Sequence, residues 1–130
     1  MALLLKQSTQ VVISFGPALL FSDGVSLVIN LVGTGANQTE NTSTGIRISK
    51  NGGAFAARAA TATASTYDAF GNYLVTLKTG DTDTLGILRV QYANAAAFCP
   101  IWQDYIVVAA NIYDSLVGGG DVLDVSVIQL

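Results

Sequence analysis

Apolar and polar residues alternate along most of this chain, in short runs separated by glycine, asparagine, aspartate and threonine. A period of two places successive side chains on opposite faces of a β-strand, and the turn-forming residues between the runs mark strand ends. Helical periodicity is nearly absent, so we expect an all-β protein. The runs that predict strands are residues 10–15, 26–32, 45–50, 55–58, 73–77, 88–92, 100–108 and 122–130.

The clearest local signal is a hairpin centred on Asn51-Gly52. Residues 45–50 alternate, with Ile46 and Ile48 on one face, and residues 55–58 return with alternation. Asn-Gly is a strong hairpin signal because both central residues of a type I′ turn need a positive φ. The sequence therefore predicts an antiparallel strand pair here.

The spacing of the turns predicts how the strands are assembled. Several short strands separated by turns at intervals of about 8–12 residues are typical of a sandwich. We expect a mostly antiparallel two-sheet sandwich, with immunoglobulin-like and jelly-roll topologies both open, as a single domain over residues 1–130. Strand alternation favours a core position for three aromatic residues, Tyr73, Tyr92 and Trp102.

Composition adds an expectation about partners. Hydrophobic residues make up 51% of the chain and charged residues only 12%, against about 25% charged in typical soluble domains. We therefore expect some apolar surface to meet another subunit. Basic residues stop at Arg89 and the net charge is −3, which argues against nucleic acid as a partner because its phosphates need clustered Lys and Arg.

No membrane partner is expected. The longest apolar region, residues 11–32, is broken by Gly16-Pro17 and by Asp23-Gly24. A membrane-spanning helix needs about 20 largely uninterrupted apolar residues.

The residues needed for most enzyme mechanisms are missing. The chain has no histidine, one glutamate (Glu40) and one cysteine (Cys99), which excludes Ser-His-Asp and Cys-His catalysis and the usual zinc sites. The acidic pair in Asp81-Thr82-Asp83 is better explained by turn capping than by a calcium site, which takes six to eight oxygen ligands. We expect a protein that is not an enzyme and has no cofactor or metal.

One predicted loop, residues 67–72, combines aromatic and polar side chains. Tyr67 and Phe70 lie there beside Asp68 and Asn72. Such a loop could bind a glycan or a partner protein, or it could simply pack on its own strands.

Both ends of the chain are apolar and are candidate contact surfaces. Residues 1–9 and 118–130 are expected as arms that reach other subunits, because an extended segment can add a strand to another sheet. The expected interface residues are Leu3, Leu4, Leu5, Val125, Val127, Ile128 and Leu130.

Several short motifs resemble a known group of proteins. These are Phe15-Gly16-Pro17, Asp23-Gly24-Val25, Thr44–Ala54, Tyr73–Leu77, Asp81–Gly86 and Asn111–Val117. In their order and spacing the chain resembles small structural proteins and N-terminal modules encoded among the virion genes of tailed bacteriophages. The resemblance covers about residues 11–127, rests on turns and strand edges, and implies a virion component with no catalytic residues.

This resemblance and the apolar ends favour a capsid decoration (cement) subunit. Its expected partners are other copies of itself, with a trimer favoured, and virion proteins such as the major capsid protein. The alternative is a tail or fibre attachment module that binds a host-surface glycan or another virion protein through residues 67–72.

Overall fold

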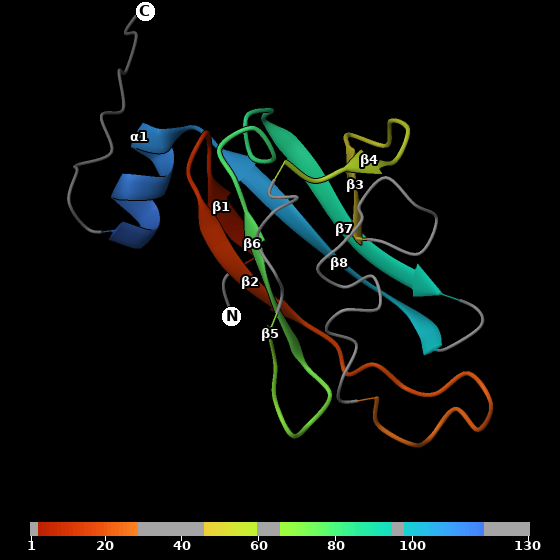
Figure 1. Cartoon of the computed structure of the whole chain (residues 1–130). Coiled ribbons are helices and arrows are strands. Elements are labelled where there is room, and N and C mark those ends of the chain that lie inside the picture. Colours follow the sequence, from red (N-terminus) through yellow and green to blue (C-terminus); the bar gives the residue numbers. More distant parts are fainter. Residues whose placement is uncertain (1–2, 29–45, 60–65, 95–97, 119–130) are drawn as a thin grey trace, which may run out of the picture.

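The computed structural model in Figure 1 describes residues 3–28, 46–59, 66–94 and 98–118, and most of the regular structure in this part of the chain is β-strand. A short helix and a π-helical turn follow the last strand. The elements are β1 (Leu4–Lys6), β2 (Val11–Phe15), β3 (Ile46–Lys50), β4 (Ala56–Ala57), β5 (Thr66–Tyr67), β6 (Tyr73–Leu77), β7 (Gly86–Asn94), β8 (Phe98–Val108), α1 (Ala110–Tyr113) and η1 (Asp114–Gly118). The predicted all-β class is confirmed.

The strands form two sheets. One has the order β1-β8-β7-β3-β4 and the other the order β2-β6-β5. Neighbouring strands are antiparallel except β1 and β8, which pair in parallel from Leu4 opposite Ile106 to Lys6 opposite Val108. Although β1 and β2 are consecutive in sequence, they belong to different sheets.

The predicted Asn51-Gly52 hairpin is confirmed. Asn51 and Gly52 have φ values of 52° and 75°, and the amide of Gly53 donates to the carbonyl of Lys50 at 3.0 Å. Ile48 pairs with Ala56, so the returning segment holds one more residue than β3 does. The turn therefore has the two positive φ values that the sequence predicts, and one extra residue follows it before the pairing with β3 begins.

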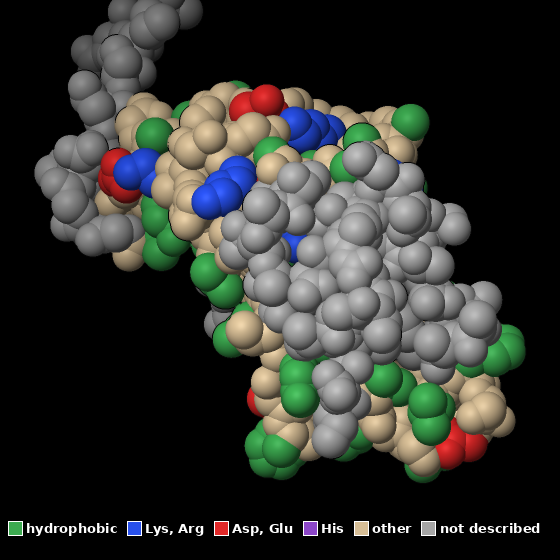
Figure 2. All heavy atoms as spheres, viewed as in Figure 1, with side chains coloured by type: hydrophobic (Ala, Val, Ile, Leu, Met, Phe, Trp, Pro, Cys, Tyr) green, Lys and Arg blue, Asp and Glu red, His purple; other side chains and the backbone are tan. Residues whose placement is uncertain are grey.

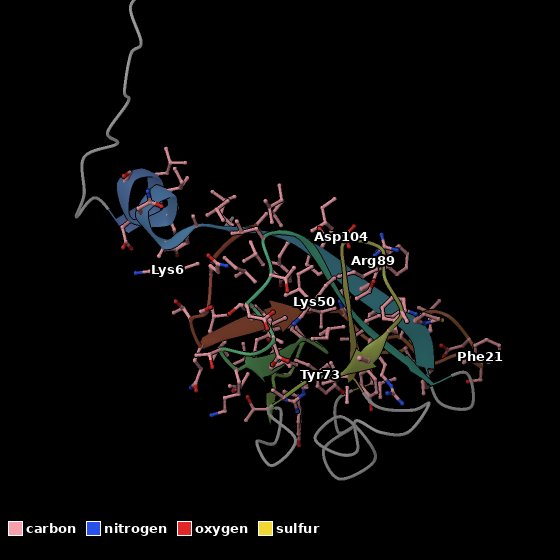
Figure 3. The ribbon with its side chains drawn as sticks, turned by 90° about the horizontal axis from the view of Figure 1, so that it is seen from above. Lys6, Phe21, Lys50, Tyr73, Arg89 and Asp104 are labelled. Atoms are coloured by element: carbon pink, nitrogen blue, oxygen red, sulfur yellow. The ribbon has the colours of Figure 1, made fainter. Side chains whose placement is uncertain are left out.

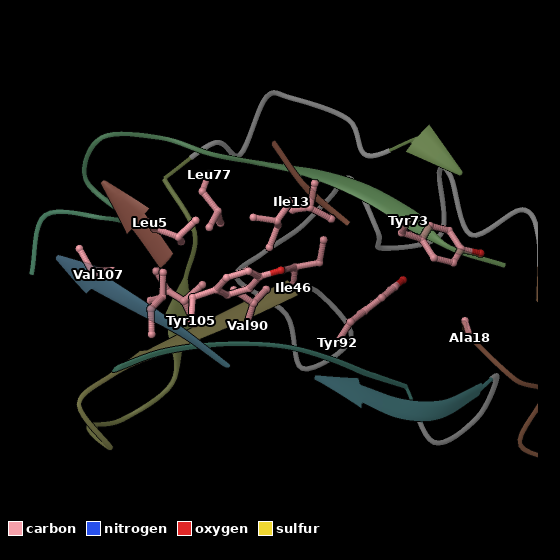
Figure 4. Packing of buried hydrophobic residues seen from close by; sticks show 13 residues of the cluster. Leu5, Ile13, Ala18, Ile46, Tyr73, Leu77, Val90, Tyr92, Tyr105 and Val107 are labelled. Carbon is pink, nitrogen blue, oxygen red and sulfur yellow. The ribbon is translucent and has the colours of Figure 1, made fainter. Parts of the chain in front are cut away.

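One hydrophobic cluster draws on both sheets (Figure 4). Its buried members are Leu5, Ile13, Ala18, Ile46, Ile48, Tyr73, Val75, Leu77, Leu88, Val90, Tyr92, Tyr105 and Val107. The alternation predicted for β3, β6 and β7 is confirmed, because the side chains expected to face inward are the buried ones.

The predicted core position of Trp102 is wrong. Its side chain is 58% exposed. In β8 it is Tyr105 and Val107 that point into the core, and a period of two then turns the even-numbered Trp102 and Ile106 to the opposite face.

Other expected elements differ in part. Of the predicted strand 26–32, only residues 26–28 lie in the described chain, where Leu27 forms an isolated bridge with Leu19. Leu4–Lys6, within the expected N-terminal arm, forms β1 and pairs with the chain's own β8. Residues 119–130 of the expected C-terminal arm lie outside the described residues.

Within the described ranges, no helix is long and apolar enough to cross a membrane.

Candidate interaction surface

The solvent-facing side of the five-stranded sheet carries a row of apolar side chains. Leu4 of β1 lies opposite Ile106 of β8, which lies opposite Ile87 of β7. Trp102 lies further along β8 on the same face. Phe55, from the β3–β4 connection, lines a depression together with Ile87. We call these five residues the outer face. Four of them are well exposed, Ile87 by 56% of its surface.

An ion pair lies in the middle of the outer face. The guanidinium of Arg89 donates from Nε to Oδ1 of Asp104 at 2.7 Å and from Nη2 to Oδ2 at 2.9 Å. Figure 3 shows the two side chains together on the sheet. The hydrogen bonds from Arg89 lower the pKa of Asp104, and those to Asp104 raise the pKa of Arg89. The pair is therefore charged over the whole physiological pH range.

The outer face also contains a shallow depression of about 420 Å³. Phe55, Ile87 and the Arg89–Asp104 pair line it, together with the glycine turn after β3. Aromatic residues and arginine are enriched at protein interfaces, where a large side chain often anchors in a pocket. In the view of Figure 2, most of the charged side chains lie in the upper part of the molecule, whereas exposed apolar side chains also follow its lower part.

The loop of residues 67–72 is closed by Asp68. One carboxylate oxygen of Asp68 accepts hydrogen bonds from the amides of Phe70 at 2.8 Å and Asn72 at 3.0 Å. The other accepts from the side-chain amide of Asn72 at 3.1 Å. These hydrogen bonds, the one from the Asn72 backbone amide first, lower the pKa of Asp68. The polar groups proposed for a ligand thus already hold the loop together.

The two aromatic residues of this loop are exposed to different degrees. Tyr67 packs against Tyr73, with ring centroids 6.3 Å apart and ring planes inclined at 43°. Phe70 is 71% exposed and projects from the tip. Both offer an apolar surface on which a sugar ring or a partner side chain could stack.

The expected N-terminal interface residues have separate positions. Leu5 is only 5% exposed and belongs to the core of its own chain, so little of it is left for another subunit. Leu4 lies on the outer face, and Leu3 is exposed beside it. Val125, Val127, Ile128 and Leu130 lie outside the described residues.

Within Asp81-Thr82-Asp83, the predicted turn capping is confirmed for Asp81 but not for Asp83. Asp81 is buried, and its carboxylate accepts from the amides of Ala59 at 2.7 Å and Lys78 at 2.8 Å. Asp83 instead accepts from Nζ of Lys50 at 2.6 Å. The described residues contain no cluster of three or more acidic or cysteine side chains that could hold a metal ion.

Sequence reasoning did not single out Ile87 or Phe55. Ile87 has the same strand parity as Arg89 and Gln91, which the alternation of β7 places on the solvent side. The exposure of Ile87 could therefore have been predicted from its position in the alternation of β7. Phe55 lies in the irregular segment between the Asn51-Gly52 turn and β4, where strand alternation does not apply.

No protein-family model, curated protein or solved structure matches this chain.

Proposed function

We propose that this chain is a structural protein of a tailed-phage particle, most simply a capsid decoration subunit that contacts its neighbours through the outer face. The observation that carries the proposal is an exposed apolar row across β1, β8 and β7, with Trp102 and Phe55 beside it. A contiguous apolar patch of this kind on a soluble protein marks an interaction site. The phage assignment itself is supported by the sequence resemblance.

The Arg89–Asp104 pair fits this role. A charge pair inside an apolar contact adds little affinity, but it penalises a partner that lacks matching polar groups. It would therefore fix how a neighbouring subunit is placed, while the apolar side chains supply the affinity.

In its finer detail we propose a two-sheet sandwich, with immunoglobulin-like and jelly-roll topologies as the two alternatives. The shared hydrophobic cluster supports it, since each sheet contributes one buried face. For the assembly we propose a closed ring, with a trimer favoured, because soluble homo-oligomers adopt closed symmetry. The other partner is the major capsid protein, and the location is the virion.

Substitution of Ile87→Asp tests the outer face. The variant is expected to lose self-association in light scattering and to stop co-sedimenting with undecorated capsids, because it places an unpaired charge in the contact. Leu74→Asp is the matched control, since Leu74 is an exposed strand residue of the other sheet. Circular dichroism checks that both variants fold. If Ile87→Asp associates and binds capsids as well as the unchanged chain, the outer face is not the contact.

The second candidate function is attachment through the 67–72 loop. Exposed Phe70 and Tyr67 favour it, whereas the internal use of Asp68 and Asn72 weakens it, because sugars are normally oriented by free polar groups. A glycan array compares the unchanged chain with Phe70→Ala and Tyr67→Ala. Binding that both variants lose would support attachment, and an array with no bound glycan would remove it.

A further inference from the structure

β1 and β2 end the two sheets on this side of the molecule (Figure 1). A groove lies between them. It has a volume of about 440 Å³ and is lined mainly by these two strands, with Tyr105 and Tyr113. Among the described residues, β1 pairs only with β8, and β2 pairs only with β6. Both strands therefore turn an unused edge towards the groove.

The backbone of β1 shows which groups face the groove. The carbonyl of Leu3 accepts from the amide of Ile106 at 2.8 Å, and the amide of Gln7 donates to Val108 at 2.9 Å. In a parallel pair, the backbone groups of alternate residues point to opposite edges of the strand. The N–H and C=O groups of Leu4 and Lys6 therefore point away from β8 and into the groove, where a further strand would pair with them.

The side chains around the groove suit an alternating strand. Leu5 and Ile13 bring the hydrophobic core to its inner side. Lys6 and Gln10 are at its rim. A strand in this position would bury every second side chain and expose the others.

We infer that residues 121–130 of the same chain bind in this groove as a strand antiparallel to β1. In this segment Leu123, Val125 and Val127 alternate with Asp124 and Ser126. The three apolar residues would share the inner face, and the two polar residues would face solvent near Lys6.

The described chain ends at residue 118, close to the groove, which supports residues 121–130 as the segment that binds there. Nζ of Lys6 donates to both carboxylate oxygens of Asp114, at 2.8 and 2.9 Å, so η1 starts beside the end of β1. Tyr113 lines the groove itself. The chain then reaches Gly118-Gly119-Gly120, where missing Cβ atoms permit a sharp reversal. A strand entering from the Lys6 end would run opposite to β1.

Tethering favours the chain's own segment over that of a second copy. A short linker gives an effective concentration of about a millimolar, which a second copy exceeds only at high protein concentration. The ten residues 121–130 would extend about 33 Å as a strand, more than enough to cover β1. This strand would then join the two sheets along one side, between β1 and β2.

A spin label at residue 126 tests both the groove and the source of the strand. The label is attached to Ser126→Cys in a Cys99→Ser background, on the side expected to face solvent. Within one ¹⁵N-labelled chain, the label is expected to broaden the amide signals of Leu4 and Lys6 while leaving those of β4, at the far edge of the sheet, sharp. Absence of broadening at Leu4 and Lys6 would overturn the inference.

A mixed sample separates the two sources. Chains that carry the spin label but no ¹⁵N are mixed with ¹⁵N-labelled chains that have no spin label. No broadening is expected in the ¹⁵N-labelled chains. Broadening of Leu4 and Lys6 in this sample would show that the strand comes from another copy and would overturn the intramolecular form.

Hydrogen exchange with a matched pair of variants gives a second readout. Val125→Asp is expected to speed exchange at the Leu4 and Lys6 amides by about tenfold, because a charge on the inner face opens the local pairing. Ser126→Asp changes the solvent side and is expected to leave exchange unchanged. Equal exchange in the two variants would count against the groove as a strand site. Capsid binding plays no part in these readouts, so their failure leaves the proposed function intact.

Discussion

The side chain of Asn51 occupies the space that any side chain at position 86 would need. A Cβ atom on Gly86 would lie 2.0 Å from Oδ1 of Asn51, and Gly86 has a φ of +115°. Asn51 donates from Nδ2 to the carbonyl of Leu85 at 2.9 Å and accepts from the amide of Ile87 at 2.8 Å. The hairpin turn is thus tied to the start of β7, and it depends on this glycine.

Gly86→Ala is expected to lower the free energy of unfolding by about 3 kcal/mol, because the alanine meets both a steric overlap and an unfavourable φ. Urea denaturation measures it. Gly80→Ala is the control, since the nearest atom to its added Cβ would be 3.8 Å away, and it should change stability by less than about 1 kcal/mol. In an Asn51→Gly background the cost of Gly86→Ala should fall. An unchanged cost there would show that the overlap is not its cause.

Tyr92 makes stability depend on alkaline pH. Burial, with a smaller contribution from nearby Tyr73, raises the pKa of its phenol above the value of about 10 in the unfolded chain. Because the pKa is higher in the folded chain than in the unfolded chain, the contribution of Tyr92 to the free energy of unfolding is fully present below about pH 10 and is lost as the pH rises above it. Melting temperature is therefore expected to fall above about pH 10, and less steeply in Tyr92→Phe. Identical pH profiles for the two proteins would contradict this account.

Among the elements, the turn from β1 to β2 and the loop from β6 to β7 are joined by one buried hydroxyl. Oγ1 of Thr82 accepts from the amide of Thr9 at 3.1 Å and donates to the carbonyl of Thr9 at 2.9 Å. The amide of Ser8 donates to the carbonyl of Thr82 at 2.9 Å. These bonds connect segments that lie far apart in sequence, and they hold the two sheets in place at this end.

Thr82→Val keeps the shape of the side chain but removes its two hydrogen bonds with Thr9 and a longer one, of 3.5 Å, to the carbonyl of Thr79. It is expected to cost about 2 kcal/mol, because the amide and carbonyl of Thr9 lose a buried partner. Thermal unfolding measures the loss. Thr84→Val is the control because its hydroxyl bonds only at the surface, to Asp83, and it should cost less than about 0.5 kcal/mol. A similar loss in both variants would show that the Thr9 contact is not what matters.

Strands with local signals were predictable from the sequence. The Asn51-Gly52 turn carries its own backbone preference, and alternation gives the buried side of β3, β6 and β7. The core position predicted for Trp102 was wrong because alternation shows which residues share a face of a strand but not which of the two faces is buried. Asp104 shares its parity and pairs with Arg89 of β7, so the charged neighbours indicated the solvent side.

Pairings distant in sequence were not predictable in this way. A three-residue strand such as β1 has no periodicity of its own, and its partner β8 lies about a hundred residues away. Leu5 therefore resembled part of a free apolar end, although it completes the core. The same reason hid the outer face, since the row of Leu4, Ile106 and Ile87 exists only once three strands are in register.

At the scale of the whole molecule, the exposed apolar surface goes together with the low content of charged residues. Only 12% of residues are charged, and the outer face has one ion pair among five apolar side chains. Self-association through such a face is expected to persist at high salt, because screening acts on charges and not on apolar contact. Light scattering at low and high ionic strength checks this. Dissociation at high salt would indicate that exposed ion pairs hold the copies together.

The parallel pairing of β1 with β8 also affects the order of folding. β7 and β8 lie next to each other in sequence and can form early, whereas closing the long loop between β1 and β8 is slow. During synthesis the partner of Leu4–Lys6 does not exist until residue 108 has been made. Until then Leu4–Lys6 stays unpaired in the nascent chain, with Leu5 exposed. The growing polypeptide is thus most vulnerable to chaperone capture and misassembly at this segment.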